Sequence, residues 1–298
     1  RVACPPRAEG GDYRCCAMLD FQSGIDDYLR GITLSIRGID LQESAKRQGF
    51  VSDYFDWAYP EVVHWGHVQL DEYDVSMSTS TIAERIAEGE LDGWDDPRAP
   101  TLQSIRRRGI RGEAVVESMI GLGMSTSDVD LAMSSIYANN RDLVDDKADR
   151  YFLVRDGERV PVVGEEKPAA GNPPRHPNHE DRGRREIPVD DAVLVEPADL
   201  PSDGERIWLK GYGCVRYADG AFVATGDDID AVREDGVDVI HWVPADGTVS
   251  VRVRTPDGDV IGEAEPGFAE TDVDEIIQFE RIGFVRVDGH AADDSVVY

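Results

Sequence analysis

The periodicity of apolar residues changes near residue 151, and this change restricts the fold more than any other feature of the sequence. Before it, several segments carry apolar residues at helical spacing. After it, apolar runs are short and are separated by turn sequences such as DG, ADG and PDGD. Many short strands with frequent turns are typical of a β-barrel or a β-sandwich. We therefore expect an all-β region over residues 151–298, with a proline-rich loop over 165–185.

Residues 1–80 predict a different arrangement, in which helices and strands alternate. Helical spacing covers 25–32 and 41–57. Strand-like runs cover 33–40 and 62–71. Such alternation favours an α/β layer with a parallel sheet. In the second helix three residues are expected to face inward: Ala45, Phe50 and Tyr54.

Residues 81–150 carry helical patterns almost throughout. Thr81 followed by Glu84 predicts a capping box at the start of the first helix. Further helices are expected over 100–110, 112–123, 125–140 and 142–152. The expected fold class is thus multi-domain, with an α/β part, a helical part and a β part in that order.

Acidic residues strongly outnumber basic ones. The chain has 60 Asp and Glu against 31 Lys and Arg, and its net charge is −29. Hydrophobic residues make up 41% of the chain, so we expect it to fold rather than remain disordered. Excess surface carboxylate is tolerated where salt screens its repulsion, within about 3 Å at 1 M. The composition therefore indicates a protein that works in concentrated salt.

The sequence excludes several other classes of protein. No run of 18 apolar residues is present, and the first twenty residues contain no apolar core of a signal peptide. We therefore expect a cytoplasmic protein without a membrane partner. The four cysteines follow no common zinc-binding spacing, so we expect reduced thiols and no metal site. They are Cys4, Cys15, Cys16 and Cys214.

A run of small, mostly hydroxyl-bearing residues lies at the expected start of the helix near residue 81. It comprises Ser76, Met77, Ser78, Thr79 and Ser80. Hydroxyl and backbone N–H groups at a helix N-terminus suit a phosphate group, because the helix dipole adds partial positive charge there. Local structure offers a second explanation, since serine and threonine also cap helices.

Six separated segments resemble glutamyl- and glutaminyl-tRNA synthetases, which are class I aminoacyl-tRNA synthetases. SMSTS is similar to their KMSKS loop, and the segments 23–40 and 93–110, which contain LSIRGID and GWDDPR, resemble the sequences on either side of that loop. Three later segments resemble their anticodon-binding region: 178–189, 237–243 and 278–288. The chain looks closest to the archaeal, non-bacterial type of glutamyl-tRNA synthetase. Its acidic composition points to a haloarchaeal source.

The resemblance implies a domain layout. Residues 1–80 would be the C-terminal part of a Rossmann-type catalytic domain, and residues 81–150 a helical connecting region that contacts the tRNA stem. Residues 151–298 would be an anticodon-binding region built of β-barrels.

The resemblance also implies an activity. A glutamate–tRNA ligase uses ATP to form glutamyl-adenylate and then transfers the glutamyl group to tRNA. The expected substrates are thus L-glutamate, tRNA and ATP, with Mg²⁺ accompanying ATP. We expect no DNA partner, and we expect the protein to be a monomer.

The same resemblance assigns roles to residues that precede the KMSKS-like loop. Arg37 lies where the family carries the arginine of its RG-x-D-type motif, and its guanidinium could pair with the substrate carboxylate. The alternative is a structural ion pair with Asp40 or Asp26. Asp26 and Asp27 could orient Arg37 or cap a helix. The expected substrate-binding set is Arg37, Asp26, Asp27 and Asp40.

Two clusters of basic residues are candidates for contact with tRNA phosphates. The first would face the inner arm of the tRNA and consists of Arg106, Arg107 and Arg108. The second would lie near the anticodon and consists of Arg182, Arg184 and Arg185. Surface ion pairs within an acid-rich protein are the other interpretation.

Aromatic residues of the β region could read the anticodon. Unstacked bases are recognised by stacking and by hydrogen bonds to their edges. Most aromatic residues of a β-barrel are buried, so only exposed ones are suitable. The candidates are Tyr212, Trp242, Phe279 and Phe284.

The sequence departs from the family pattern at several positions. The HIGH motif, which belongs upstream of the KMSKS-like loop, is absent, so we interpret the chain as a C-terminal fragment that cannot form adenylate alone. Ser76 and Thr79 occupy the two lysine positions of the loop. Leu19 and Ser35 replace a tyrosine and a histidine common in relatives. Two other functions therefore remain open: a non-catalytic tRNA-binding module and a glutamine–tRNA ligase.

Overall fold

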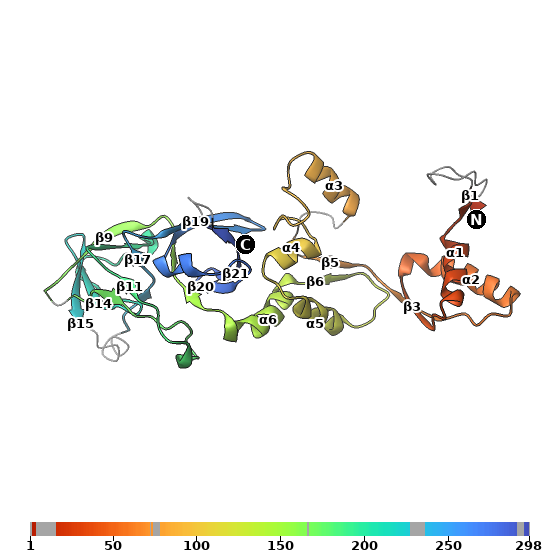
Figure 1. Ribbon diagram of the computed structural model, residues 1–298, viewed down its shortest axis with the longest axis horizontal. Helices are drawn as coiled ribbons and strands as arrows, with labels where there is room; N and C mark the ends of the chain where they lie inside the picture. Colours follow the sequence, from red (N-terminus) through yellow and green to blue (C-terminus); the bar gives the residue numbers. More distant parts are fainter. Residues whose placement is uncertain are drawn as a thin grey trace. The chain divides into compact units, whose positions relative to one another are not determined.

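The chain forms two compact units (Figure 1). The computed structural model describes residues 2–3, 16–71, 73, 78–165, 167–226, 236–290 and 295–297. Unit 1 contains Arg1–Asp71 and Met119–Ala132, and unit 2 contains Glu72–Ser118 and Met133–Tyr298. The three regions expected from the sequence stay a prediction, because the division into units follows other boundaries.

Unit 1 has the α/β organisation that the alternating pattern predicts. Helices α1 and α2 pack on each other. Strands β3 and β4 pair in parallel, as do β5 and β6, whereas β1 and β2 are antiparallel. The elements are β1 (Val2–Ala3), β2 (Cys16–Ala17), α1 (Leu19–Leu29), β3 (Leu34–Gly38), the 3₁₀ turn η1 (Ile39–Leu41), α2 (Gln42–Tyr54), β4 (Glu61–Trp65), β5 (Val68–Leu70) and β6 (Val129–Leu131).

The segment 62–71, expected as one strand, belongs to two strands. β4 ends at Trp65, β5 begins at Val68, and the two strands belong to different sheets. Gly66 lies between them, close to the backbone before β6. A Cβ on residue 66 would lie 2.2 Å from the carbonyl oxygen of Ser127, so a side chain there would clash with backbone. Glycine permits the approach that separates the strands.

Helix α2 turns a polar face inward, so the expectation for Phe50 and Tyr54 was wrong. Ala45 is buried as expected, but Phe50 and Tyr54 are 74% and 82% exposed. The other buried residues of α2 are Gln48 and Ser52, which follow Ala45 at helical spacing. Hydrogen bonds of Gln48, rather than contacts of the aromatic rings, hold this face of the helix.

Unit 2 contains α3 (Thr79–Ala87), α4 (Leu102–Arg107) and α6 (Met133–Val144), and α5 (Gly112–Leu122) crosses the boundary between the units. The capping box predicted at Thr81 and Glu84 was wrong, because both residues lie inside α3. The N-cap position belongs to Ser78, whose side chain makes no capping hydrogen bond. At α4, in contrast, Thr101 Oγ1 accepts a hydrogen bond from the N–H of Ser104 (3.0 Å).

The helices expected over 125–140 and 142–152 are also shorter than predicted. Strand β6 occupies part of the first range, because its residues pair with β5. In the second range α6 ends at Val144, and a 3₁₀ turn, η2 (Asp145–Lys147), leads into a strand.

The remainder of unit 2 is built on two seven-stranded sheets, as the pattern after residue 151 predicts. The order of the first sheet is β16-β13-β14-β15-β9-β12-β17. Its strands are β9 (Glu158–Val163), β12 (Ala192–Val195), β13 (Arg206–Leu209), β14 (Gly213–Ala218), β15 (Ala221–Gly226), β16 (Val239–Ile240) and β17 (Val243–Pro244).

The order of the second sheet is β7-β20-β21-β22-β18-β19-β8. Its strands are β7 (Arg150–Tyr151), β8 (Leu153–Val154), β18 (Val249–Thr255), β19 (Gly258–Ala264), β20 (Ile276–Phe279), β21 (Gly283–His290) and β22 (Ser295–Val297). A small antiparallel pair joins β10 (Ala170–Gly171) to β11 (Ile187–Pro188). Short 3₁₀ turns lie at η3 (Glu180–Arg182), η4 (Pro197–Asp199) and η5 (Pro266–Glu270).

One extended segment links the cores of the two sheets. Strands β7 and β8, the edges of the second sheet, are separated by Phe152 alone. Tyr151 and Leu153 belong to the core of the second sheet, whereas Phe152 and Val154 belong to the core of the first. Because successive side chains of a strand point to opposite sides, residues 151–154 contribute to both cores at once.

The described strands form open sheets. No pairing among the described residues joins the two edge strands of either large sheet to each other, so closed barrels are not shown. None of the described helices has the length and hydrophobicity that a transmembrane segment requires.

Candidate substrate and tRNA sites

Arg37, near the end of β3, is held by three acceptors. Its Nη2 lies 2.5 Å from Asp27 Oδ2, its Nε donates to Ser35 Oγ (3.0 Å) and its Nη1 donates to Gln48 Oε1. The side chains of Arg37 and Asp27 are only 10% and 20% exposed. A guanidinium has five N–H donors, and the Tyr59 hydroxyl also takes a hydrogen bond from Arg37, so one donor is left for a ligand.

The acidic residues expected around Arg37 play different parts. Asp26 and Asp27 lie in the second half of α1, so neither caps the start of that helix. Asp27 pairs with Arg37, and Asp26 accepts a hydrogen bond from Gln22 Nε2 (3.3 Å). Asp40 is exposed at the turn after β3. The ion pair of Arg37 is therefore with Asp27, which the sequence offered as a residue that could orient Arg37, and not with Asp40 or Asp26.

Gln48 is a residue of this site that sequence reasoning missed. It is fully buried, and its Nε2 donates to Leu19 O (3.0 Å) and Ser23 Oγ (2.7 Å). Its Oε1 accepts from Tyr59 OH (2.9 Å) as well as from Arg37. Burial raises the pKa of the Tyr59 hydroxyl, so Tyr59 stays a neutral donor. Glutamine is usually a surface residue of a helix, so its presence in α2 carried no signal of this role.

The hydroxyl run is described only in its second half. Ser76 and Met77 lie outside the described residues. Ser78 precedes α3 in an extended conformation, and its Oγ lies 2.9 Å from Ser80 Oγ. Thr79 and Ser80 are exposed in the first turn. The first N–H groups of a helix have no carbonyl partner within it, so hydroxyl and N–H donors lie together here. Such an arrangement suits phosphate oxygens.

Of the arginines at the end of α4, only Arg106 lies exposed without an ion pair to any described residue. Arg107 Nη1 lies 3.0 Å from Asp95 Oδ2, and its Nη2 lies 2.8 Å from Asp288 Oδ2. Arg108 Nη1 donates to the hydroxyl group of Tyr73 (2.8 Å), and its Nη2 donates to that of Tyr137. The Arg108 guanidinium also lies 5.4 Å from the centre of the Tyr137 ring. Arg107 and Arg108 therefore support the fold in this structure.

The arginines of the proline-rich loop also differ from one another. Arg182 pairs with Asp149 (2.5 Å), which also accepts from Arg175 (3.0 Å). Arg184 is exposed and donates to the carbonyl oxygen of Asn172 (2.6 Å). Arg185 is buried, so it cannot be the surface phosphate contact that the sequence suggested.

Arg185 lies between the two sheets and beside a cavity of about 430 Å³. Its Nε lies 2.8 Å from Glu265 Oε1, and its guanidinium stacks 4.8 Å above the Phe152 ring. Its Nη2 is buried without a hydrogen-bond partner among the described residues. Burial raises the pKa of Glu265 to about 7, because desolvation of the carboxylate outweighs the attraction of Arg185.

Three of the four candidate aromatic platforms are buried. Trp242 and Phe279 have no exposed surface, and Tyr212 is 6% exposed. They belong to the sheet cores, so they cannot stack on bases without rearrangement. Phe284 is half-buried, and the Arg150 guanidinium lies 5.6 Å from the centre of its ring.

Three family models match the chain in order. The catalytic-domain model of the tRNA synthetases class I (E and Q) matches residues 12–146. Two anti-codon binding domain models of the same family match residues 148–232 and 239–288. The chain belongs to the class I (E and Q) tRNA synthetases. The resemblance noted in the sequence is thereby confirmed.

Relatives of this class I (E and Q) synthetase chain include glutamate–tRNA ligases of salt-loving archaea. That of Natronomonas pharaonis is 65% identical over 293 residues, which are 98% of this chain and 51% of the relative. That of Haloarcula marismortui is 67% identical over 297 residues, which are 97% of this chain and 50% of the relative. The glutamate–tRNA ligase of Methanosarcina acetivorans is 41% identical over 98% of this chain and 52% of the relative. The chain thus spans about half the length of the curated relatives it matches.

Proposed function

We propose that this chain works in glutamate–tRNA ligation, the ATP-dependent attachment of L-glutamate to tRNA. The observation that carries the proposal is the 65% identity to a glutamate–tRNA ligase over 98% of the chain. The acidic composition of this chain agrees with its similarity to proteins of salt-loving archaea.

ATP would bind where the hydroxyl run meets α3. Ser78, Thr79 and Ser80 would offer hydroxyl and N–H donors to the phosphates, together with Ser76 and Met77. Donors at this place stabilise the negative charge that develops on the departing pyrophosphate. Mg²⁺ would enter bound to the ATP phosphates, as part of the substrate. Among the described residues no three His, Cys, Asp or Glu side chains gather as a metal site.

L-Glutamate would be held by Arg37. The N–H donor that its protein contacts leave would pair with a substrate carboxylate. Asp27 and Gln48 fix the guanidinium from the other side, so they would position it rather than touch the substrate. Asp26 and Asp40 would affect the site only through the local charge.

The anticodon would be read by the two large sheets, which we propose to act as the barrels of the anticodon-binding region. The cavity beside Arg185 suits an extruded base rather than a phosphate, because five acidic side chains line it against two arginines, Arg175 and Arg185. The unpaired Nη2 of Arg185 would donate to a base carbonyl, and the Tyr151 ring in the cavity wall offers apolar contact. Exposed Arg106 and Arg184 would meet phosphates on the surface.

The test is filter binding of the chain to glutamate, glutamine and unrelated tRNAs in concentrated KCl. We expect selective retention of the glutamate tRNA, and at least about tenfold weaker binding for Arg185→Lys, which keeps the positive charge but removes the Nη2 donor of the guanidinium. Arg216→Lys, at an exposed position of β14, serves as the matched control and should bind as the unmodified chain does. Equal or absent retention of all three tRNAs would contradict the proposal.

The alternatives make different predictions in the same experiment. Preference for the glutamine tRNA would favour a glutamine–tRNA ligase. A non-catalytic tRNA-binding module is favoured by Ser76, which lacks the cation of the family's lysine. Such a module would bind the glutamate tRNA. Its affinity for ATP would be the same in the Ser76→Lys variant, which restores the cation, as in the unmodified chain.

A further inference from the structure

The outer face of α2 begins a patch of large aromatic side chains that the fold leaves largely exposed. Phe50 and Tyr54 lie one turn apart on this face and are 74% and 82% exposed. Phe55, directly after the helix, is 48% exposed, and its ring lies edge-on to Tyr54 with the ring centres 5.1 Å apart. Stacking continues from Phe55 to Trp57 (4.8 Å) and from Trp57 to Tyr28 of α1 (4.2 Å). These five residues form an aromatic patch, and contiguous exposed apolar surface of this kind marks an interaction site.

Glycine at position 49 opens the surface beside Phe50. Gly49 lies in the interior of α2, where glycine is less favourable than alanine. A Cβ on residue 49 would meet no atom within 4 Å, so the described chain gives no steric reason for glycine. On the helix surface Gly49 belongs to a diamond of positions i, i+3, i+4 and i+7, whose other corners are Lys46, Phe50 and Asp53. Such a diamond receives one side chain of a facing helix, and the missing Cβ leaves room in it for a large ring.

The charges on this face of α2 are complementary to those of the same face turned around. Lys46 lies one turn before Phe50, and Asp53 lies about one turn after it. In an antiparallel pair of α2 helices with Phe50 near the two-fold axis, Lys46 of each copy would face Asp53 of the other. Opposite charges would therefore meet twice, as the self-complementarity of a two-fold interface requires.

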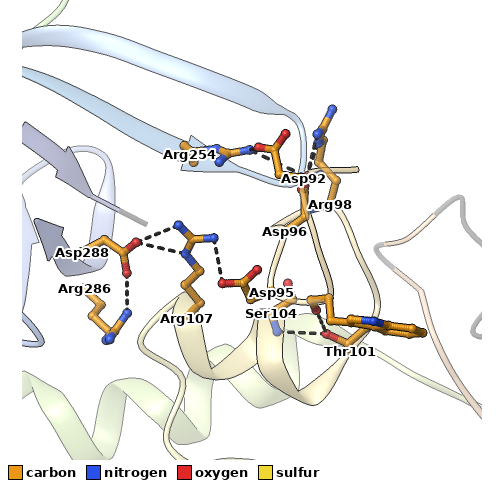
Figure 2. A network of polar contacts seen from close by, with 11 residues as sticks. Asp92, Asp95, Asp96, Arg98, Thr101, Ser104, Arg107, Arg254, Arg286 and Asp288 are labelled. Atoms are coloured by element: carbon orange, nitrogen blue, oxygen red, sulfur yellow. Dashed lines mark hydrogen bonds and ion pairs between the residues drawn. The ribbon is translucent and has the colours of Figure 1, made fainter. Parts of the chain in front are cut away.

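These charges are available to a second copy. The Asp53 carboxylate has no ion pair with any described residue. In unit 2, by contrast, an ion-pair network joins the segment between α3 and α4 to β18 and β21, and each labelled arginine there contacts an aspartate (Figure 2). Lys46 Nζ lies 2.6 Å from Glu43 Oε1, in a pair whose side chains are 60% and 66% exposed. Such exposed pairs contribute little to stability, so Lys46 can exchange Glu43 for Asp53 of a second copy.

We propose that the outer face of α2 is a self-association surface, through which two copies of this chain form a two-fold symmetric dimer. Phe50 of each copy would enter the diamond beside Gly49 of the other, and the remaining rings of the aromatic patch would extend the apolar contact. Gln48, which holds Arg37, is buried on the opposite face of α2, so pairing leaves the contacts of Arg37 intact. The monomer expected from the family resemblance would then be the dissociated state.

A second copy suits the aromatic patch better than a nucleic acid does. Bases stacked on the rings would bring phosphates beside Asp53 and Asp56, the exposed acidic residues that flank Tyr54 and Phe55. A second copy instead brings a lysine to Asp53 and apolar rings to apolar rings. Concentrated salt screens the repulsion between two chains of charge −29 within about 3 Å at 1 M, so burial of the rings can drive their association.

The test is sedimentation velocity of the 298-residue chain over a range of protein concentrations in concentrated KCl. We expect a monomer–dimer equilibrium with a dissociation constant in the micromolar range, because one short helix pair gives a small interface. Phe50→Ser should weaken association at least about tenfold, since it removes the central ring. Leu102→Ser, at a position of α4 that is 73% exposed, is the matched control and should associate as the unmodified chain does.

Two further variants test the arrangement of the helices. Lys46→Asp should weaken association at least about fivefold, because like charges would then meet, and adding Asp53→Lys should restore it to within about twofold. Gly49→Ala should weaken association about tenfold, because its Cβ fills the diamond. In dilute solution, where the chain is monomeric, the same variant should unfold at a higher temperature, because alanine favours the helix. A glycine needed only by the fold would lower that temperature instead.

The other outcomes each overturn a stated part. A chain that stays monomeric at every concentration would overturn self-association, and the aromatic patch would then belong to a different partner. A dimer that Phe50→Ser and Gly49→Ala leave unchanged would mean that the copies meet elsewhere. If Asp53→Lys does not restore what Lys46→Asp removes, the antiparallel arrangement is wrong. Self-association and the proposed function fail separately, because the sedimentation experiment contains neither tRNA nor ATP.

Discussion

At the scale of single residues, the arginines of this acidic chain fall into three groups that differ in what surrounds them. Arg106 and Arg184 are exposed, Arg107 and Arg182 are held in ion pairs, and Arg185 is buried between the two sheets. Neighbours in sequence thus have different surroundings, because the chain turns between them. Exposed arginines suit phosphates, whereas the buried one suits a base edge.

Glu280 gives a prediction at this scale. It follows β20 in the second sheet and accepts hydrogen bonds from Lys210 and from His241 Nε2 (3.1 Å), which both belong to the first-sheet region. Burial opposes its ionisation, but the two donors prevail and lower the pKa of Glu280 to about 2, from an ordinary value of 4.5. Because the folded state holds the lower pKa, Glu280 stabilises the fold above pH 4.5 and loses this effect as the pH falls toward 2.

We therefore expect Glu280→Gln to reduce the free energy of unfolding by about 3 to 5 kcal/mol at pH 7. The variant should also lose less stability than the unmodified chain between pH 4.5 and 2. Denaturant titrations at several pH values in constant KCl would measure both effects. Glu158→Gln, at an exposed position of β9, is the matched control. Equal acid sensitivity of Glu280→Gln and the unmodified chain would contradict the assignment.

At the scale of elements, close backbone approach decides where strands lie. Gly171 of β10 faces the ring of Trp242, and a Cβ on residue 171 would lie 2.5 Å from Trp242 Cζ2. Trp242 has no exposed surface, and its Nε1 donates to the carbonyl oxygen of Lys210 (3.1 Å). The ring is therefore held on all sides and cannot withdraw easily.

We expect Gly171→Ala to lower the free energy of unfolding by about 1 to 3 kcal/mol through overpacking. Thermal unfolding in concentrated KCl would measure the loss. Gly112→Ala is the control in the same unit, since a Cβ on residue 112 meets no atom within 4 Å. A stability of Gly171→Ala equal to that of the control would mean that Trp242 moves freely.

At the scale of the whole molecule, net charge dominates. A charge of −29 on 298 residues opposes compaction unless salt screens it. We expect the chain to unfold or aggregate in low salt and to refold above about 1 M KCl, where the screening length is about 3 Å. Circular dichroism during a KCl titration would show the transition. Full stability in salt-free buffer would contradict the interpretation of the composition.

The sequence by itself determined what depends on local order. The change of periodicity near residue 151, the parallel α/β start and the turns between short strands are properties of neighbouring residues, and the structure has them. The segments that resemble the synthetase family are each contiguous in sequence, so they could also be recognised without a structure. The family models confirm the resemblance. Local reasoning failed at the start of α3, which begins at Thr79 rather than after Thr81. It also failed at the strand break at Gly66, where the backbone of Ser127, distant in sequence, comes close.

Only the tertiary structure decided which side chains meet. Arg37 of β3 pairs with Asp27 of α1, although Asp40 is nearer in sequence. Phe50 is exposed, because the inner face of α2 is occupied by Gln48 and its buried hydrogen bonds. Arg185 is enclosed because Glu265, eighty residues later, folds against it. Which side chains are buried, and which partners they contact, depends on residues from the whole chain. The periodicity of apolar residues shows only which face of a single segment is apolar.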